Sequence, residues 1–297
     1  MKRSEKALYS VRLFLATVVL LGAAQGWADP NEGVIDRALR LSGVESQVKM
    51  LSRAILAAIP IETFSPPASE ARVQSMLRKA FDEEAPLESV RRAVREDFDP
   101  EKIEQVVNFY SSKLGGRIGR LMGRALNPAL LTAVRENRHI VKALSAARLA
   151  SIEHIVRVER VTEFNIRLQI AVVRGLVEGR LQENAESPDR RRKIRRNLAE
   201  AEKKIRGTEK RTWDTAMAAF AYTFRSLTDE ELEEFISYLE SDAASWFRTA
   251  VQRGMEQAVL EASKAVGRIT VEANPRKAPE QKSGRASRTP AGAADGE

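Results

Sequence analysis

The chain has no cysteine and only two histidines among its 297 residues. Without cysteine it has no disulfide framework, no thiolate metal site and no lipobox to carry a lipid anchor. The histidines form no His-Glu-x-x-His motif, and the single Glu136-x-x-His139 would have to occur twice in a di-iron bundle. We therefore expect no metal site, and interpret His139 and His154 as partly exposed polar residues of helices.

Aromatic residues are also scarce, at 6% of the chain, whereas hydrophobic residues reach 43% and Ala, Leu, Arg and Glu are abundant. This composition favours helices over strands, and the apolar content is adequate for a hydrophobic core. The sequence predicts an all-α fold, a multi-helix bundle that occupies residues 29–270.

Long apolar runs are missing except for the twelve residues 13–24. Basic residues precede this run, and Gly26-Trp27-Ala28 supplies the small residues of a cleavage site, so residues 1–28 are predicted to be a signal peptide. The run is too short for an ordinary membrane span, and no later stretch is long or apolar enough for one. We expect a periplasmic or secreted bacterial protein, with an uncleaved signal anchor as the alternative.

Two stretches, 98–126 and 227–255, share a pattern that predicts a degenerate helix-turn-helix repeat. Asp99 and Pro100 form the start of the first copy, and Thr228 starts the second with a capping box. Apolar residues then recur at helical spacing, which predicts one buried face in each copy. These residues are Ile103, Val106, Val107 and Tyr110 in the first copy, and Leu232, Phe235, Ile236 and Leu239 in the second.

Glycines mark several expected breaks and contacts between helices. Ser42-Gly43 divides a helical segment, Gly115-Gly116 separates the two helices of the first copy, and Gly267 ends the last helix. Gly175 and Gly179 form a Gly-x-x-x-Gly pattern, which in a soluble protein indicates close helix packing.

Other boundaries follow from proline and from length. Short helices are expected at 69–83 and 86–97. The proline-free stretch 129–187 would be too long as one helix of a compact domain, so it predicts two or three helices. Residues 271–297 are rich in Pro, Gly, Ala, Ser and charge, which predicts a disordered tail.

The chain is basic, with a formal net charge of +8. Residues 1–28 hold four Lys/Arg and one Glu, so the remainder has 45 basic and 40 acidic side chains and a net charge of +5. Basic residues concentrate between 190 and 211, either as the solvated face of a connecting helix or as a contact for an anionic surface. The residues of that contact would be Arg190, Arg191, Arg192, Lys193, Arg195 and Arg196.

The sequence contains no catalytic constellation. It has no serine in a strand-to-helix elbow, no Gly-x-Gly-x-x-Gly loop and no P-loop. Ser112 and Ser241 occupy the same position in the two copies, but each closes a helix, where serine commonly bonds local backbone. We therefore expect no catalytic residue and no cofactor, and a protein that is not an enzyme.

Three short stretches resemble a bacterial exported family catalogued as domain of unknown function 2059. They are LRLSG at 39–43, FYSSKLG at 109–115, similar to the family's Phe-Tyr-x-Ser-x-x-Gly turn, and FRSLTDEELEEFISYLES at 224–241. The resemblance implies an all-helical periplasmic or secreted protein, and it transfers no catalytic residue. The second copy departs from the pattern, because Ala244 stands where the turn has glycine.

These observations support a non-enzymatic binding or scaffolding protein of the cell envelope, whose partner is an envelope protein or an anionic envelope surface and not nucleic acid. The alternative is a carrier of a small apolar ligand or lipid in a cavity between the two copies. A third hypothesis, an envelope hydrolase, would rest on His139, His154, Ser112 and Ser241 alone.

Overall fold

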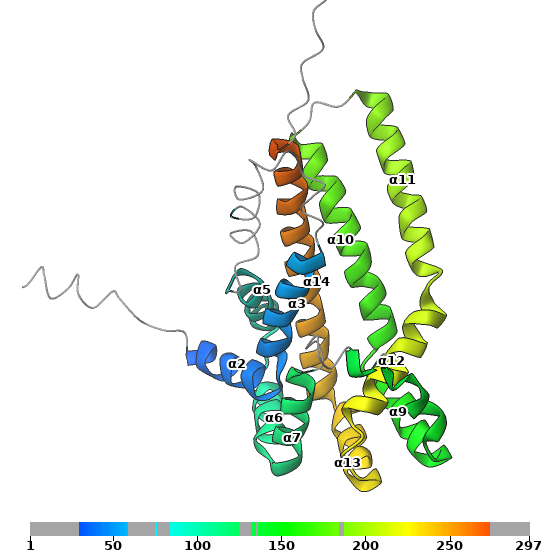
Figure 1. Ribbon diagram of the computed structural model, residues 1–297. Helices are drawn as coiled ribbons and strands as arrows, with labels where there is room; N and C mark the ends of the chain where they lie inside the picture. Colours follow the sequence, from blue (N-terminus) through cyan, green and yellow to red (C-terminus); the bar gives the residue numbers. More distant parts are fainter. Residues whose placement is uncertain are drawn as a thin grey trace, which may run out of the picture.

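The computed structural model describes residues 30–58, 75, 84–124, 132–134, 136–183 and 187–273. Within these ranges every regular element is a helix, which confirms the predicted all-α class (Figure 1). The expected signal peptide, residues 274–297 of the expected tail and nearly all of the expected helix 69–83 lie outside the described residues.

The chain first forms α2 (Pro30–Leu41) and α3 (Val44–Ala58), separated at Ser42-Gly43 as predicted. Gly43 has a φ of +81°, a left-handed conformation that favours glycine. The turn also lies directly against α7 (Lys113–Gly123), because a Cβ on Gly43 would be 2.2 Å from the carbonyl oxygen of Gly119. The glycine of the LRLSG stretch is therefore a backbone contact point.

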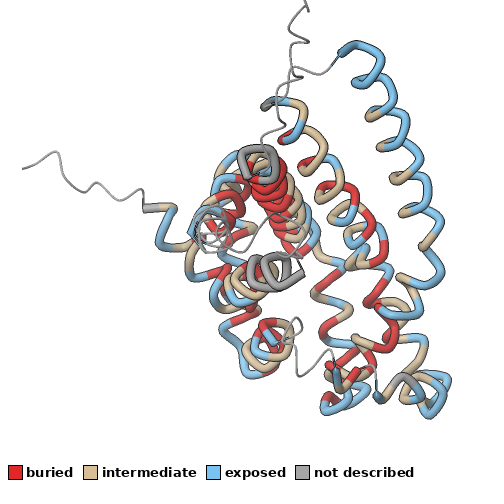
Figure 2. Tube along the Cα trace, turned by 45° about the horizontal axis from the view of Figure 1, so that its top comes forward, coloured by how far each residue is buried: buried red, intermediate tan, exposed pale blue. Residues whose placement is uncertain are grey.

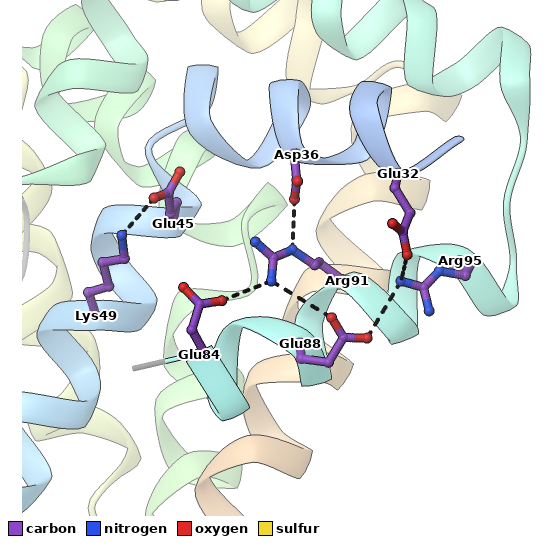
Figure 3. Close-up of polar contacts among 8 residues, drawn as sticks. All are labelled: Glu32, Asp36, Glu45, Lys49, Glu84, Glu88, Arg91 and Arg95. Atoms are coloured by element: carbon purple, nitrogen blue, oxygen red, sulfur yellow. Dashed lines mark hydrogen bonds and ion pairs between the residues drawn. The ribbon is translucent and has the colours of Figure 1, made fainter. Parts of the chain in front are cut away.

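Helix α5 (Glu84–Glu96) begins two residues before the expected start at Pro86 and is joined to α2 by ion pairs (Figure 3). Arg91 Nε donates to Asp36 Oδ1 at 2.7 Å, and its Nη1 donates to Glu84 Oε2 at 3.2 Å. Arg95 Nη2 donates to Glu32 Oε1 at 3.2 Å. The Arg91–Asp36 and Arg95–Glu32 pairs link the two helices, and because all these pairs are partly exposed they contribute little stability.

The first predicted copy is α6 (Pro100–Ser111) followed by α7. Asp99 caps α6 as predicted, since its carboxylate accepts from the backbone N–H groups of Glu101 and Lys102 at 3.1 Å. The predicted apolar face of α6 is buried. The predicted break at Gly115-Gly116 is wrong: both glycines lie within the first turns of α7, and the break is at Ser112.

The reason for this error is a close approach between neighbouring helices. A Cβ on Gly115 would lie 2.0 Å from the carbonyl oxygen of Phe109, so this position needs a glycine because α7 folds tightly back on α6. The Ser112 hydroxyl caps α7 by accepting from the Gly115 N–H at 3.0 Å. Helix α7 ends at Gly123, and the expected stop near Asn127-Pro128 lies outside the described residues.

The described part of the proline-free stretch contains the 3₁₀ helix η3 (Arg138–Ala143), α9 (Ala146–Val158) and α10 (Val161–Glu183), and residues 132–134 and 136 are also helical. The stretch is thus divided into several helices, as predicted. Between α9 and α10 the chain turns at Glu159 and Arg160, and Arg160 has a φ of 52°. An arginine in this left-handed conformation carries some backbone strain.

The second half contains α11 (Pro188–Arg206), α12 (Glu209–Thr223), α13 (Asp229–Leu239) and α14 (Asp242–Ala273). The capping box predicted at Thr228 and Glu231 is present at the start of α13. The predicted helix end at Gly267 is wrong, because α14 continues to Ala273 and includes the first three residues of the expected tail.

Helices α10 and α14 pack side by side and run in the same direction (Figure 1). Near the N-terminal ends of both helices, Arg167 of α10 donates to Gln252 and Glu256 of α14. Near their C-terminal ends, Arg268 of α14 donates to Gln182 of α10.

Close helix packing, predicted for Gly175 and Gly179, occurs between α10 and α14. A Cβ on Gly179 would lie 2.1 Å from the Lys264 carbonyl oxygen, and one on Gly267 would lie 2.5 Å from that of Leu176. Gly267 is thus a packing residue inside a helix and not a helix end.

One hydrophobic cluster contains the buried faces of both predicted copies, together with residues of α2, α5, α9 and α12. The large fully buried side chains include Ile103 and Ile118 from the first copy, and Leu232 and Phe235 from the second. Figure 2 shows buried residues along the helices of this cluster and none along α11. Among the described helices, none has both the length and the apolar character needed to cross a membrane.

Candidate functional site

The six predicted contact residues lie together on α11, and all six are exposed. They are Arg190, Arg191, Arg192, Lys193, Arg195 and Arg196. Three sequence features start this helix: Pro188 is at its first position, Ser187 accepts from the Arg190 N–H at 3.4 Å, and Asp189 is in the first turn. Asp189 also pairs with Arg192.

Helix α11 contributes no buried residue to the core, although it is 19 residues long. Its C-terminal half is tied to α10 by Arg174, which donates from Nε to Glu202 Oε1 at 2.6 Å and from Nη2 to Oε2 at 3.0 Å. The hydrogen bond from Arg174 lowers the pKa of Glu202 in spite of partial burial. Figure 1 shows the N-terminal half of α11 standing apart from the other helices drawn as ribbons.

One side of α11 is apolar. Ile194, Leu198 and Ile205 are half-buried and recur at spacings of four and seven residues, which places them on the same side as Glu202. Because Glu202 contacts Arg174, this side faces α10. The opposite side is left to basic residues.

The turn between α12 and α13 is held by two arginines from the first half of the chain. Arg148 donates to the carbonyl oxygens of Phe224 at 2.9 Å and Leu227 at 2.8 Å, and it pairs with Asp229. Its planar fork thus bonds two carbonyl groups of the turn between α12 and α13. Arg117 from α7 forms two hydrogen bonds with Glu231, at 2.8 and 2.9 Å.

A polar cluster lies in the interior where α6, α9, α13 and α14 meet. Arg248 Nη1 is 3.5 Å from Glu159 Oε1, and their side chains are 12% and 20% exposed. Gln252 donates to the Glu159 carbonyl oxygen at 2.8 Å, which fixes the turn before α10. The phenols of Tyr110 and Tyr238 lie close enough to interact electrostatically with Glu159.

Burial sets the protonation of this cluster. Burial raises the pKa of Tyr110 well above its ordinary value, and the neighbouring Tyr238 and Glu159 raise it further. Burial, then Glu159, raises the pKa of Tyr238. Burial also raises the pKa of Glu159, whereas Arg248 lowers it. Both phenols are therefore protonated at neutral pH, which suits neither a nucleophile nor a general base.

The residues considered for chemistry have local structural contacts. Ser112 and Ser241 both cap helices, Ser241 by accepting from the Ala244 N–H at 3.2 Å. His154 Nε2 lies 2.8 Å from Glu240 Oε1 in an exposed pair, and His139 is exposed. Over the ranges that the structure describes, no three His, Cys, Asp or Glu residues are grouped to hold a metal ion.

Comparisons with known protein families, curated proteins and solved structures find no match. The resemblance to domain of unknown function 2059 therefore stays a prediction. The site must be interpreted from its own geometry.

The contact between the two predicted copies is filled by aromatic rings. Phe109 stacks on Tyr238 with ring centroids 3.6 Å apart and planes 2° from parallel, and Phe235 and Tyr110 surround this pair. The carrier hypothesis places its ligand cavity between the copies, and these ring contacts give it no support.

The basic residues of α11 are predictable from the sequence, whereas the interior polar cluster is not. Its members Tyr110, Glu159, Tyr238 and Arg248 come from four elements, and no spacing along the chain links them. The unusual φ of Arg160 beside Glu159 is also a property of the folded backbone alone.

Proposed function

We propose that this chain is a non-enzymatic binding or scaffolding protein of the bacterial cell envelope, in which a helical body presents α11 to a partner. The observation that carries the proposal is that α11 spans 19 residues, buries none of them and is strongly basic. A helix with no share in the core gains little stability from folding against it. A contact outside the chain accounts for a helix of this length that carries charge and no core residue.

We also propose that the helical body consists of two related halves, 98–126 and 227–255. Support comes from matching hydrogen bonds: Ser112 N–H donates to the Phe109 carbonyl and Ser241 N–H to the Tyr238 carbonyl, both at 3.0 Å. Phe109 and Tyr238, which stack on each other, also occupy matching positions. Ala244 takes the place of the turn glycine while the serine cap is kept.

Export is part of the proposal. It is supported by the leader pattern of residues 1–28 and by the resemblance to an exported family. In this view the mature protein is periplasmic or secreted, and α11 meets its partner in the envelope.

Site-specific photo-crosslinking in intact cells tests this function. A photoreactive amino acid replaces Ala199, which is exposed on α11. The matched control carries the same probe at Ser237, which is exposed on α13. We expect adducts, whether with protein, polymer or lipid, from position 199 in the envelope fraction and none above background from position 237.

Equal yields of adducts at both positions, or none at position 199, would refute the role of α11. Recovery of the protein from the cytoplasm with residues 1–28 intact would refute its export.

A further inference from the structure

The outward side of α11 is a basic strip with no apolar anchor. Opposite the half-buried Ile194 and Leu198, this side carries residues three, four or seven positions apart, all exposed. They are Arg192, Lys193, Arg196, Lys203 and Lys204, and Glu200 is the one acidic residue among them besides Asp189, which pairs with Arg192.

This composition argues against a specific protein interface. Such interfaces centre on buried aromatic, aliphatic or arginine side chains that fill pockets, and lysine is depleted from them. The outward side of α11 offers only Ala199 as an apolar side chain, beside Asn197. It also has no aromatic residue on which nucleic-acid bases could stack. Recognition by this strip depends on charge alone.

We propose that the outward strip of α11 binds the acidic headgroups of a phospholipid bilayer, with the helix lying along the membrane surface. This inference rests on the proposed function and names its partner. A straight helix of this length extends about 28 Å, so its basic side chains can meet a flat charged surface together. Lipid headgroups present the spread negative charge that such a strip fits.

The acidic residues of α13 do not oppose this contact. Exposed acidic residues Glu230, Glu233 and Glu234 lie on α13. Figure 1 shows α13 at the opposite end of the molecule from the N-terminus of α11. The repulsion of these acidic residues by an acidic bilayer is therefore weakest where the basic N-terminal half of α11 meets the surface.

Vesicle binding by the full chain tests this inference. The probes are unilamellar vesicles of phosphatidylcholine with or without 30% phosphatidylglycerol, read by sedimentation. The test variant is K193Q/R196Q/K203Q/K204Q, because glutamine preserves helix propensity. The matched control, R37Q/R40Q/K113Q/R120Q, removes the same charge from exposed positions on α2 and α7. Far-UV circular dichroism checks that both variants fold, and the leader is common to all three chains.

We expect the wild type and the control to prefer acidic vesicles. The α11 variant should lose about 600-fold in its partition coefficient on them, since each of the four basic side chains near such a surface contributes about fivefold. Binding of the wild type should also fall steeply with salt. No change in binding to the vesicles without phosphatidylglycerol is expected.

Several results would overturn the inference. The wild type could show no preference for acidic vesicles, or the control could lose as much binding as the α11 variant. Binding of dextran sulfate through α11 without vesicle binding would assign the strip to a soluble polyanion instead. Protein adducts from position 199 without any vesicle binding would support the proposed function and refute binding to a bilayer. Vesicle binding without adducts in cells would instead show that α11 can bind acidic lipid and would refute its proposed function in the envelope.

Discussion

The contact between Gly119 and the α2–α3 turn predicts a large difference between two neighbouring glycine substitutions. A Cβ on Gly119 would lie 1.9 Å from the carbonyl oxygen of Leu41, whereas one on Gly116 of the same helix would have its nearest neighbour at 3.4 Å. The second distance is ordinary van der Waals contact. The first requires α7 and the turn to separate by about 1.5 Å.

We expect Gly119→Ala to destabilise the protein by about 2 kcal/mol. Overpacking against a backbone atom that cannot rotate away costs about 3 kcal/mol, and the better helix propensity of alanine returns at most about 1 kcal/mol. Gly116→Ala should instead be stabilising by about 0.5 kcal/mol. Gly33→Ala in α2 should behave like Gly116→Ala, since a Cβ there would have no neighbour within 4 Å.

Urea denaturation followed by far-UV circular dichroism measures all three variants against the wild type. Equal slopes of the transitions would show that the variants unfold as the wild type does. If the free energies of unfolding of the Gly119 and Gly116 variants differ by less than 0.5 kcal/mol, the close approach of α7 to the turn is not a constraint and the reasoning fails.

Three further predictions concern the interior contacts. In a double-mutant cycle with Phe109→Leu and Tyr238→Leu, unfolding free energies should show a coupling of about 0.5–1.5 kcal/mol from the stacked rings, and additivity would contradict the stack. Both buried phenols keep their protons to higher pH in the folded than in the unfolded state, so stability should fall as pH rises above about 10. Between pH 9 and 11 the urea midpoint of unfolding should fall less for Tyr110→Phe than for the wild type. An identical fall in both proteins would contradict the raised pKa of Tyr110. Arg148→Lys should cost about 1–2 kcal/mol by thermal unfolding because lysine has no planar fork to bond two carbonyls, whereas Arg120→Lys at an exposed site should cost nothing measurable.

The helices and their buried faces were predictable because helical periodicity is local. Ile103, Val106, Val107 and Tyr110 repeat at the spacing of one helix face, and all four are buried. Caps were predictable for the same reason, since Thr228 and Glu231 are three residues apart and bond each other's backbone. The basic strip is likewise a local property of one helix.

Glycines were misinterpreted where their role depends on another helix. Gly115 and Gly267 look like helix breaks in the sequence, yet each lies within a helix that approaches another backbone closely. A glycine that ends a helix and one that admits a neighbour have the same local pattern, and only the tertiary contact distinguishes them. The interior polar cluster could not be predicted for a related reason, since Glu159 and Arg248 are brought together by folding alone.

The parallel pairing of α10 and α14 has a consequence for how the chain folds. Helix α10 ends at Glu183, and its partner begins only at Asp242, so the glycine contacts between them form after a long intervening segment is in place. Helix α14 also packs against α5 and α6. Closing such distant contacts is slow relative to forming local ones. We therefore expect the central assembly to form late, when the last helix is complete, and a chain interrupted before residue 242 would leave α5, α6 and α10 without their common partner.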